Sequence, residues 1–203
     1  MDMNGQPNKN GEKSLEQNFP HNQKEMLEAQ IRECYGRVVY SHKTHEKCSD
    51  ILLDRNASIK LWQVILSAIT TGSLLVTVFG DGKGGAIIAT FFSTILLALN
   101  TYTKDFQLVE IAEKHKTAAH NLWEIRESYL SLLTDFTILS IEEIMAKRDE
   151  LQDRLSKVYQ GSPRTNFKAY SKARGSLKDQ EEMTFAEKEL DLLLPTRLRK
   201  NKE

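Results

Sequence analysis

The sequence predicts an all-α fold: a hairpin of two transmembrane helices, long cytoplasmic helical extensions that pair as an antiparallel stalk, and additional C-terminal helices. Two observations predict it. The first is a pair of apolar segments, residues 61–79 and 84–103, which contain 19 and 20 residues and no charged side chain. The second is the absence of proline between Pro20 and Pro163, which leaves the flanking segments free to form long helices.

Each apolar segment is long enough to cross a bilayer, because a helix needs roughly 20 apolar residues to span about 30 Å of hydrocarbon. The whole chain has 28% charged residues, so its apolar content is concentrated in these two segments. A secretory signal does not fit, because the first segment begins only at residue 61. The alternative is a soluble bundle with both segments in its core, but the flanking helices offer only narrow apolar stripes to cover them.

The distribution of Lys and Arg predicts the orientation of the hairpin. Positive side chains flank both spans on the side of the chain termini, whereas the connecting loop carries only Lys83. Because cytoplasmic segments carry the excess of positive charge, we expect both termini in the cytoplasm. The flanking residues are Lys43, Lys47, Arg55 and Lys60 before the first span, and Lys104, Lys114 and Lys116 after the second.

The N-terminal part of the chain divides into a tail and a helical arm. Residues 1–20 have few large apolar side chains and predict a disordered tail. Residues 21–160 form the predicted hairpin domain, and its first arm, residues 22–60, starts with Asn22 and Glu25 in capping spacing. Apolar or small side chains then recur every three or four positions, which is typical of an amphipathic helix. They are Leu27, Ile31, Cys34, Tyr35, Val38, His45, Cys48 and Leu52.

The second arm, residues 104–159, carries a matching stripe and is expected to continue the helix of the second span. A break at residues 134–136 separates a further amphipathic segment. The two arms are expected to pair antiparallel beyond the bilayer. Folding the chain about Gly82 brings residue 45 opposite roughly residue 119.

Residues 161–203 are expected to form a C-terminal helical and regulatory region, with breaks at Gly175 and Pro195. This region carries a basic patch with interleaved aromatic side chains. Such a patch is a solvated surface, or it docks a partner protein, an anionic ligand or anionic lipid headgroups. The docking candidates are Arg164, Lys168, Lys172 and Arg174.

Each span carries a stripe of polar side chains, within an arc of about 80° in the first span and about 40° in the second. The stripes either line a water-filled path between several hairpins or allow helices to pack closely in lipid. An unpaired amide in hydrocarbon costs several kcal/mol, so we expect the amides of Gln63 and Asn100 to face water or a partner. The candidate pore-lining residues are Gln63, Ser67, Thr70, Thr77, Thr90, Thr94, Asn100 and Thr101.

Two patterns that suggest ligand chemistry have simpler explanations. Gly80, Gly82 and Gly85 match the spacing of a dinucleotide loop, but no βαβ unit surrounds them, and a tight turn explains the glycines. Several histidines and a cysteine could meet across the paired arms, but their spacing is not that of a zinc site. We therefore expect no metal. The histidines and the cysteine that could meet are His42, His45, Cys48, His115 and His120.

Cysteine usage predicts the redox state of the thiols, and the absence of catalytic motifs argues against an enzyme. Cys34 and Cys48 would lie about 21 Å apart along one helix, too far for a disulfide bond, so we expect reduced thiols. The sequence has no nucleophile elbow, HExxH, paired-carboxylate or CxxC motif. We expect neither an enzyme nor a cofactor. The net charge of zero argues against a basic surface for nucleic acid.

Three features together resemble a known family: a cytoplasmic helix feeding a short hairpin, the segment AEKHKTAAHNLWEIRESYLSLLTDF at 112–136, and GSPRTNFKAYSKARGSL at 161–177. The family is SLATT, the two-transmembrane effector domains found beside SMODS and SLOG sensor proteins in bacterial conflict systems. The resemblance covers most of residues 25–178. LLLPTRLR at 192–199 resembles a subfamily that accompanies reverse transcriptases.

The resemblance implies an anti-phage defence effector that oligomerises in the bacterial inner membrane and permeabilises it, so that infection is abortive. The implied partners are further copies of the chain, membrane lipid, and a nucleotide-synthesising enzyme, sensor or reverse transcriptase from the same operon, with no direct binding of nucleic acid. A two-span hairpin is too small to enclose a channel alone, so a pore requires oligomers. The alternative is a membrane scaffold that tethers a partner enzyme and forms no pore.

Overall fold

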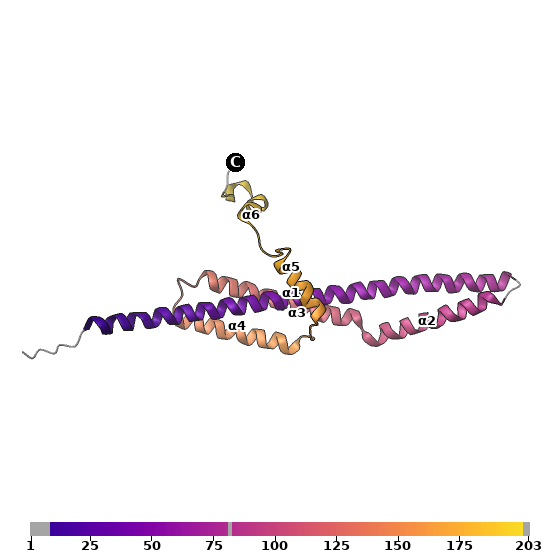
Figure 1. The fold of residues 1–203 in the computed structure, drawn as a ribbon, viewed down its shortest axis with the longest axis horizontal. Helices are drawn as coiled ribbons and strands as arrows, with labels where there is room; N and C mark the ends of the chain where they lie inside the picture. Colours follow the sequence, from indigo (N-terminus) through magenta and orange to yellow (C-terminus); the bar gives the residue numbers. More distant parts are fainter. Residues whose placement is uncertain (1–8, 81–82, 201–203) are drawn as a thin grey trace, which may run out of the picture. The chain divides into compact units, whose positions relative to one another are not determined.

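The computed structural model describes residues 9–80 and 83–200, and every regular element in this part of the chain is a helix. This confirms the predicted all-α class, with two long apolar helices that fit a hairpin and additional helices after them (Figure 1). The elements are α1 Lys9–Phe79, α2 Gly84–Phe106, α3 Leu108–Thr134, α4 Ile141–Gly161, α5 Phe167–Lys178, α6 Glu187–Leu193 and the 3-10 turn η1 Thr196–Leu198.

The chain divides into two compact units. Unit 1 combines α1 up to His42 with Ala118–Ser162, which holds the rest of α3 and α4. Unit 2 combines Lys43–Thr117, which includes the hairpin, with the C-terminal helices from Pro163 onward. The N- and C-terminal segments of the chain therefore belong to different units.

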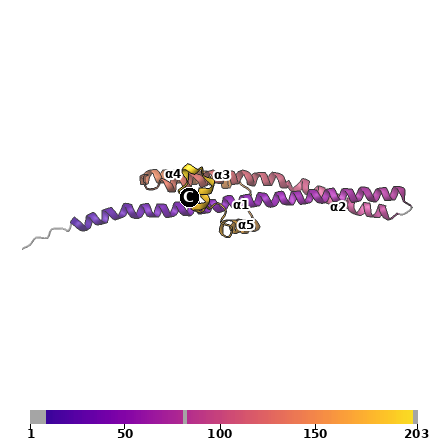
Figure 2. The same ribbon diagram turned by 90° about the horizontal axis from the view of Figure 1, so that it is seen from above.

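Unit 1 is a helical bundle with one continuous apolar core. Four members of the predicted stripe of the first arm, Leu27, Ile31, Cys34 and Val38, are buried in this core. Helix α1 lies beside α3 and α4 there (Figures 1 and 2). Burying a large apolar side chain stabilises a fold by about 1.5–3 kcal/mol, so this core accounts for the association of the three helices. The core residues are Leu27, Ile31, Cys34, Val38, Leu122, Ile125, Tyr129, Leu132, Phe136, Ile144 and Leu151.

A capping box starts α4. The Ser140 hydroxyl accepts from the Glu143 backbone N–H at 3.2 Å, and the Glu143 carboxylate accepts from the Ser140 N–H at 2.9 Å. These bonds lower the pKa of Glu143. They satisfy two backbone donors that would otherwise be unpaired at the helix start, which explains why α4 begins at Ile141.

In unit 2, the end of α1 and α2 lie side by side (Figures 1 and 2). Both are long and apolar enough to cross a membrane, and only 6% and 11% of their most apolar windows are buried. The described residues thus do not supply the cover that a soluble bundle requires. The two helices are compatible with a membrane protein.

Three boundaries differ from the prediction. Helix α1 begins at Lys9, inside the predicted tail. Residues 1–8 of that tail lie outside the described residues, as does Gly82 of the predicted turn. Helix α5 continues through Gly175 and ends at Lys178, whereas α6 ends before Pro195 as expected.

The third difference is a break between the second span and its arm, where a continuous helix was expected. Gln107 adopts left-handed backbone angles, φ 41° and ψ 46°, and separates α2 from α3. This conformation is unfavourable for a residue with a side chain by about 1–2 kcal/mol. The break changes the direction of the chain so that Leu108, the next residue, is buried, while Phe106 before it stays exposed.

Candidate functional site

Helices α1 and α2 meet through small and polar side chains. On α1, Gln63, Leu66, Thr70, Ser73 and Thr77 are more buried than their neighbours, at the three- and four-residue spacing of one helix face. On α2, the buried residues are Gly85 and Ala89. Small residues allow two helix backbones to approach closely in lipid.

The closest approach is at Gly85. A Cβ atom added there would lie 2.5 Å from the carbonyl oxygen of Ser73 and 3.1 Å from the backbone nitrogen of Thr77. The adjacent Gly84 has open space around the same position. Gly85 therefore sets the distance between the two helices, whereas Gly84 does not.

A side-chain hydrogen bond joins the other end of the hairpin. Gln63 Nε2 donates to Asn100 Oδ1 at 2.9 Å. The two amides singled out in the sequence therefore pair with each other. The pairing satisfies groups that hydrocarbon would leave without partners.

The structure separates the candidate pore-lining residues into two groups. Gln63, Thr70 and Thr77 lie on the face of α1 toward α2, and Asn100 reaches the same interface through Gln63. The other four are exposed on the outside of the hairpin. They are Ser67 on α1, and Thr90, Thr94 and Thr101 on α2.

The exposed threonines form a stripe on the outer face of α2. At 100° per residue they lie roughly opposite the face that contains Gly85 and Ala89. Thr90 Oγ1 donates to the Ala86 carbonyl at 2.8 Å, and Thr94 Oγ1 donates to the Thr90 carbonyl at 2.9 Å. Their donors are satisfied within the helix, while the oxygens keep lone pairs available to accept from water or another helix.

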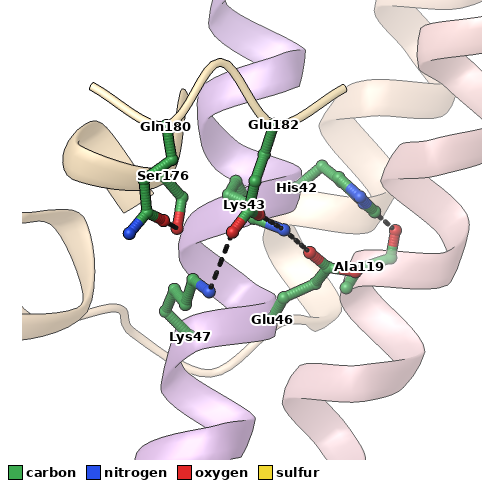
Figure 3. Close-up of polar contacts among 8 residues, drawn as sticks. All are labelled: His42, Lys43, Glu46, Lys47, Ala119, Ser176, Gln180 and Glu182. Carbon is green, nitrogen blue, oxygen red and sulfur yellow. Dashed lines mark hydrogen bonds and ion pairs between the residues drawn. The ribbon is translucent and has the colours of Figure 1, made fainter. Parts of the chain in front are cut away.

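A pair of buried histidines joins the two arms beside the hairpin. His45 Nδ1 and His115 Nδ1 are 2.9 Å apart, so one ring donates and the other accepts. In unit 1, His42 Nδ1 lies 2.9 Å from the Ala119 carbonyl oxygen (Figure 3). The predicted antiparallel pairing is thus present, with residue 45 opposite 115, one helical turn from the predicted 119.

Two further members of the predicted histidine and cysteine set have other neighbours. His120 is exposed beside Glu124, and Cys48 is buried near the Asn166 amide, 3.8 Å from its Nδ2. Burial raises the pKa of the Cys48 thiol, which makes it a poor nucleophile. No group of three or more His, Cys, Asp or Glu residues in the described part of the chain is arranged to hold a metal ion.

We expect mild acid to destabilise unit 2 through the histidine pair. Burial lowers the pKa of His115 below its usual 6.5. Below about pH 6.5 the unfolded chain therefore binds a proton that the folded chain does not, and stability falls as the pH drops. Thermal unfolding of the full chain in uncharged detergent, measured from pH 7.5 to about 5, should show a falling Tm.

Two variants test whether His115 causes the pH dependence of Tm. His115→Gln should flatten the pH dependence, whereas His120→Gln should preserve it because that ring is exposed. An unchanged slope in His115→Gln would assign the effect to another residue.

Helix α5 places the C-terminal segment against α1 in unit 2. Its small residues Ala169, Ala173 and Ser176 are buried. Asn166 caps the helix by accepting from the Ala169 N–H at 2.9 Å. The segment after α5 is then anchored by Glu182, whose carboxylate lies 2.5 Å from Lys43 Nζ and 4.0 Å from Lys47 Nζ (Figure 3).

Charge and hydrogen bonding stabilise the Glu182 contact. Burial alone would lower the pKa of Lys43, but its hydrogen bonds to Glu182 and Glu46 outweigh this effect and raise it. The hydrogen bond to Lys43 lowers the pKa of Glu182. Sequence reasoning missed this contact, because the left-handed backbone at Glu181 and Met183 that presents Glu182 leaves no mark in the sequence.

All four predicted docking residues are exposed, and one of them also lines a cavity. Lys172 lines a cavity between α5 and α1. Arg164, Lys168 and Arg174 are exposed on the surface. The cavity has a volume of about 670 Å³ and was not predicted.

Comparison with known protein families identifies a match over most of the chain. The family model of the SMODS and SLOG-associating 2TM effector domain family 4 matches residues 27–189, which includes both apolar helices and α5. No curated protein and no solved structure matches the chain. The C-terminal LLLPTRLR at 192–199 lies outside the matched residues, so the subfamily assignment stays a prediction.

Proposed function

Because the chain belongs to the SMODS and SLOG-associating 2TM effector domain family, we propose that this defence-associated two-transmembrane effector acts without catalysis, by permeabilising the membrane. The hairpin crosses the bacterial inner membrane twice, with both termini in the cytoplasm. Copies of the chain oligomerise on a signal from an operon partner that senses infection or synthesises a nucleotide. The resulting pore ends growth of the infected cell.

The exposed threonine stripe of α2 carries this proposal. The space between α1 and α2 of one hairpin is filled by the close approach at Gly85 and by the Gln63–Asn100 bond. A conducting path therefore lies between copies, against the outer faces of the hairpins. Thr90, Thr94 and Thr101 supply polar oxygens on such a face, in a segment that carries no charged side chain.

On this proposal, the predicted lining residues have two different roles. Gln63, Thr70, Thr77 and Asn100 stabilise the hairpin, and the outer stripe lines the path. The exposed basic residues Arg164, Lys168 and Arg174 remain candidates for docking the operon partner.

Replacing Thr90 and Thr94 together with leucine should reduce permeabilisation roughly tenfold, because an apolar constriction dewets. The matched variant with serine at both positions keeps the hydroxyls and should retain activity. The measurement is depolarisation and dye entry in bacteria that express the full chain with its operon partners, with the membrane fraction checked for each variant. A leucine variant that reaches the membrane and permeabilises at the original rate would contradict the lining.

The exposed leucines of the C-terminal segment favour a second candidate, a membrane scaffold. Leu192 and Leu193 are 69% and 70% exposed, which is typical of a protein contact surface. A scaffold would recruit its partner to the membrane with no change in permeability at any stage of infection. The same depolarisation measurement on the unaltered chain therefore separates the two functions.

A further inference from the structure

We propose that the cavity between α1 and α5 binds a small zwitterion, with its phosphate held by Lys47 and Lys172 and its ammonium group held by Asp50 and Asp54. All four residues line the cavity. Its volume of about 670 Å³ lies within the range of small-molecule sites. The site lies within unit 2 and does not depend on whether the hairpin forms a pore.

The four charges face the cavity from two helices. Lys47, Asp50 and Asp54 are spaced by three and four residues, so they follow one face of α1. Lys172 comes from α5, across the cavity. The rim therefore presents positive charge from both helices and negative charge from α1.

These charges are available to a ligand. Asp50, Asp54 and Lys172 form no ion pair with any other residue in the described part of the chain, and Lys47 has only the 4.0 Å contact with Glu182. Opposite charges that line one cavity without pairing can each be neutralised by one molecule that carries both signs. A simple anion would meet the two aspartates, and a simple cation would meet the two lysines.

The neighbouring contacts identify which end of the cavity takes the anion. Glu182 already places a carboxylate next to Lys47, held there by Lys43 (Figure 3). The pair Ser176 and Gln180 also lines the cavity and adds a hydroxyl and an amide, 3.4 Å apart. Lys172, which has no ion pair in the described part of the chain, and the neutral groups of Ser176 and Gln180 suit a phosphate, which competes with Glu182 only at Lys47.

The test is a titration of O-phosphoethanolamine into the full chain in uncharged detergent, followed by ³¹P NMR and calorimetry. Inorganic phosphate and ethanolamine, the two halves of the probe, are titrated separately. We expect saturable binding of the zwitterion that is at least roughly tenfold tighter than either half. Absence of saturation, or phosphate that binds as tightly as the zwitterion, overturns the proposal.

Charge variants locate the site. Lys172→Gln and Asp54→Asn should each weaken binding by about fivefold or more. Lys168→Gln is the matched control, because Lys168 is on α5 and exposed but does not line the cavity. Lys172 and Asp54 are both exposed, so we expect each variant to fold. Circular dichroism checks the folding of each variant. Equal weakening by Lys168→Gln and Lys172→Gln would mean nonspecific attraction and would overturn the site.

The source of the zwitterion is distinguished by a second probe. Glycerophosphoethanolamine has the phosphodiester of a lipid headgroup, whereas O-phosphoethanolamine is a soluble phosphate monoester. Binding of both probes with similar affinity indicates a lipid headgroup. Binding of the monoester alone indicates a soluble metabolite.

Discussion

Gly85→Val is expected to separate α1 from α2, while Gly84→Val leaves the hairpin intact. The Cβ of any residue at position 85 would lie 2.5 Å from the Ser73 carbonyl oxygen. Since the obstacle is backbone, no change of side-chain rotamer relieves it, and the helices must move apart. Overpacking of this kind costs about 1–3 kcal/mol, and valine belongs at the upper end because it is also branched.

The two glycines are adjacent in the first turn of α2, so the two substitutions add the same side chain to the same turn and differ mainly in the space around it. The measurement is thermal unfolding of the full chain in uncharged detergent, together with dye entry in cells. Gly85→Val should lower Tm and remove permeabilisation. If the two variants unfold at the same temperature, the close approach at Gly85 does not stabilise the hairpin.

Leu122→Ala should strongly destabilise unit 1. Leu122 is fully buried in α3, among the core residues contributed by α1 and α4. Removing three carbon atoms from such a site costs about 2–5 kcal/mol, through lost burial and the cavity that remains. Chemical denaturation of the full chain, followed by circular dichroism, measures the change.

Leu130→Ala provides the control on the same helix. Leu130 is 44% exposed, so its truncation should cost well under half as much as that of Leu122. Equal losses for both variants would show that α3 is not held by the core described for unit 1.

The features that sequence reasoning predicted are those with a repeating pattern. The two spans were visible as uncharged segments, and the stripe through Leu27, Ile31 and Val38 gave the buried face of α1. The pairing of the arms followed from folding the chain at its glycine-rich turn. The error of one helical turn at His45 arose because the break at Gln107 changes the path of the second arm.

The features that were missed depend on tertiary contacts. Nothing in the sequence around Gln107 marks a break, since no glycine or proline is present. The role of Gly85 depends on the backbone of Ser73, which lies on the other helix. The start of α4 could have been found, because Ser140 and Glu143 have the spacing of a capping box.

The threonine stripe shows the limit of helical periodicity. A wheel diagram places Thr90, Thr94 and Thr101 on one face, but it cannot tell whether that face meets α1 or the surroundings. Gly85 and Ala89 are buried on the other side of α2, so the threonine face points away from α1. Only the structure could therefore separate the residues that stabilise the hairpin from those that remain available to another copy.

The break at Gln107 makes the two sides of the hairpin different: one is a continuous helix, and the other is interrupted. In unit 2, α1 runs without interruption from Lys47 at the cavity to Phe79 at the far end of the first span. The second span instead ends at a single left-handed residue before α3 begins. The cavity residues of α1 therefore share one uninterrupted helix with the first span, whereas the second span is a helix separate from the arm that follows it.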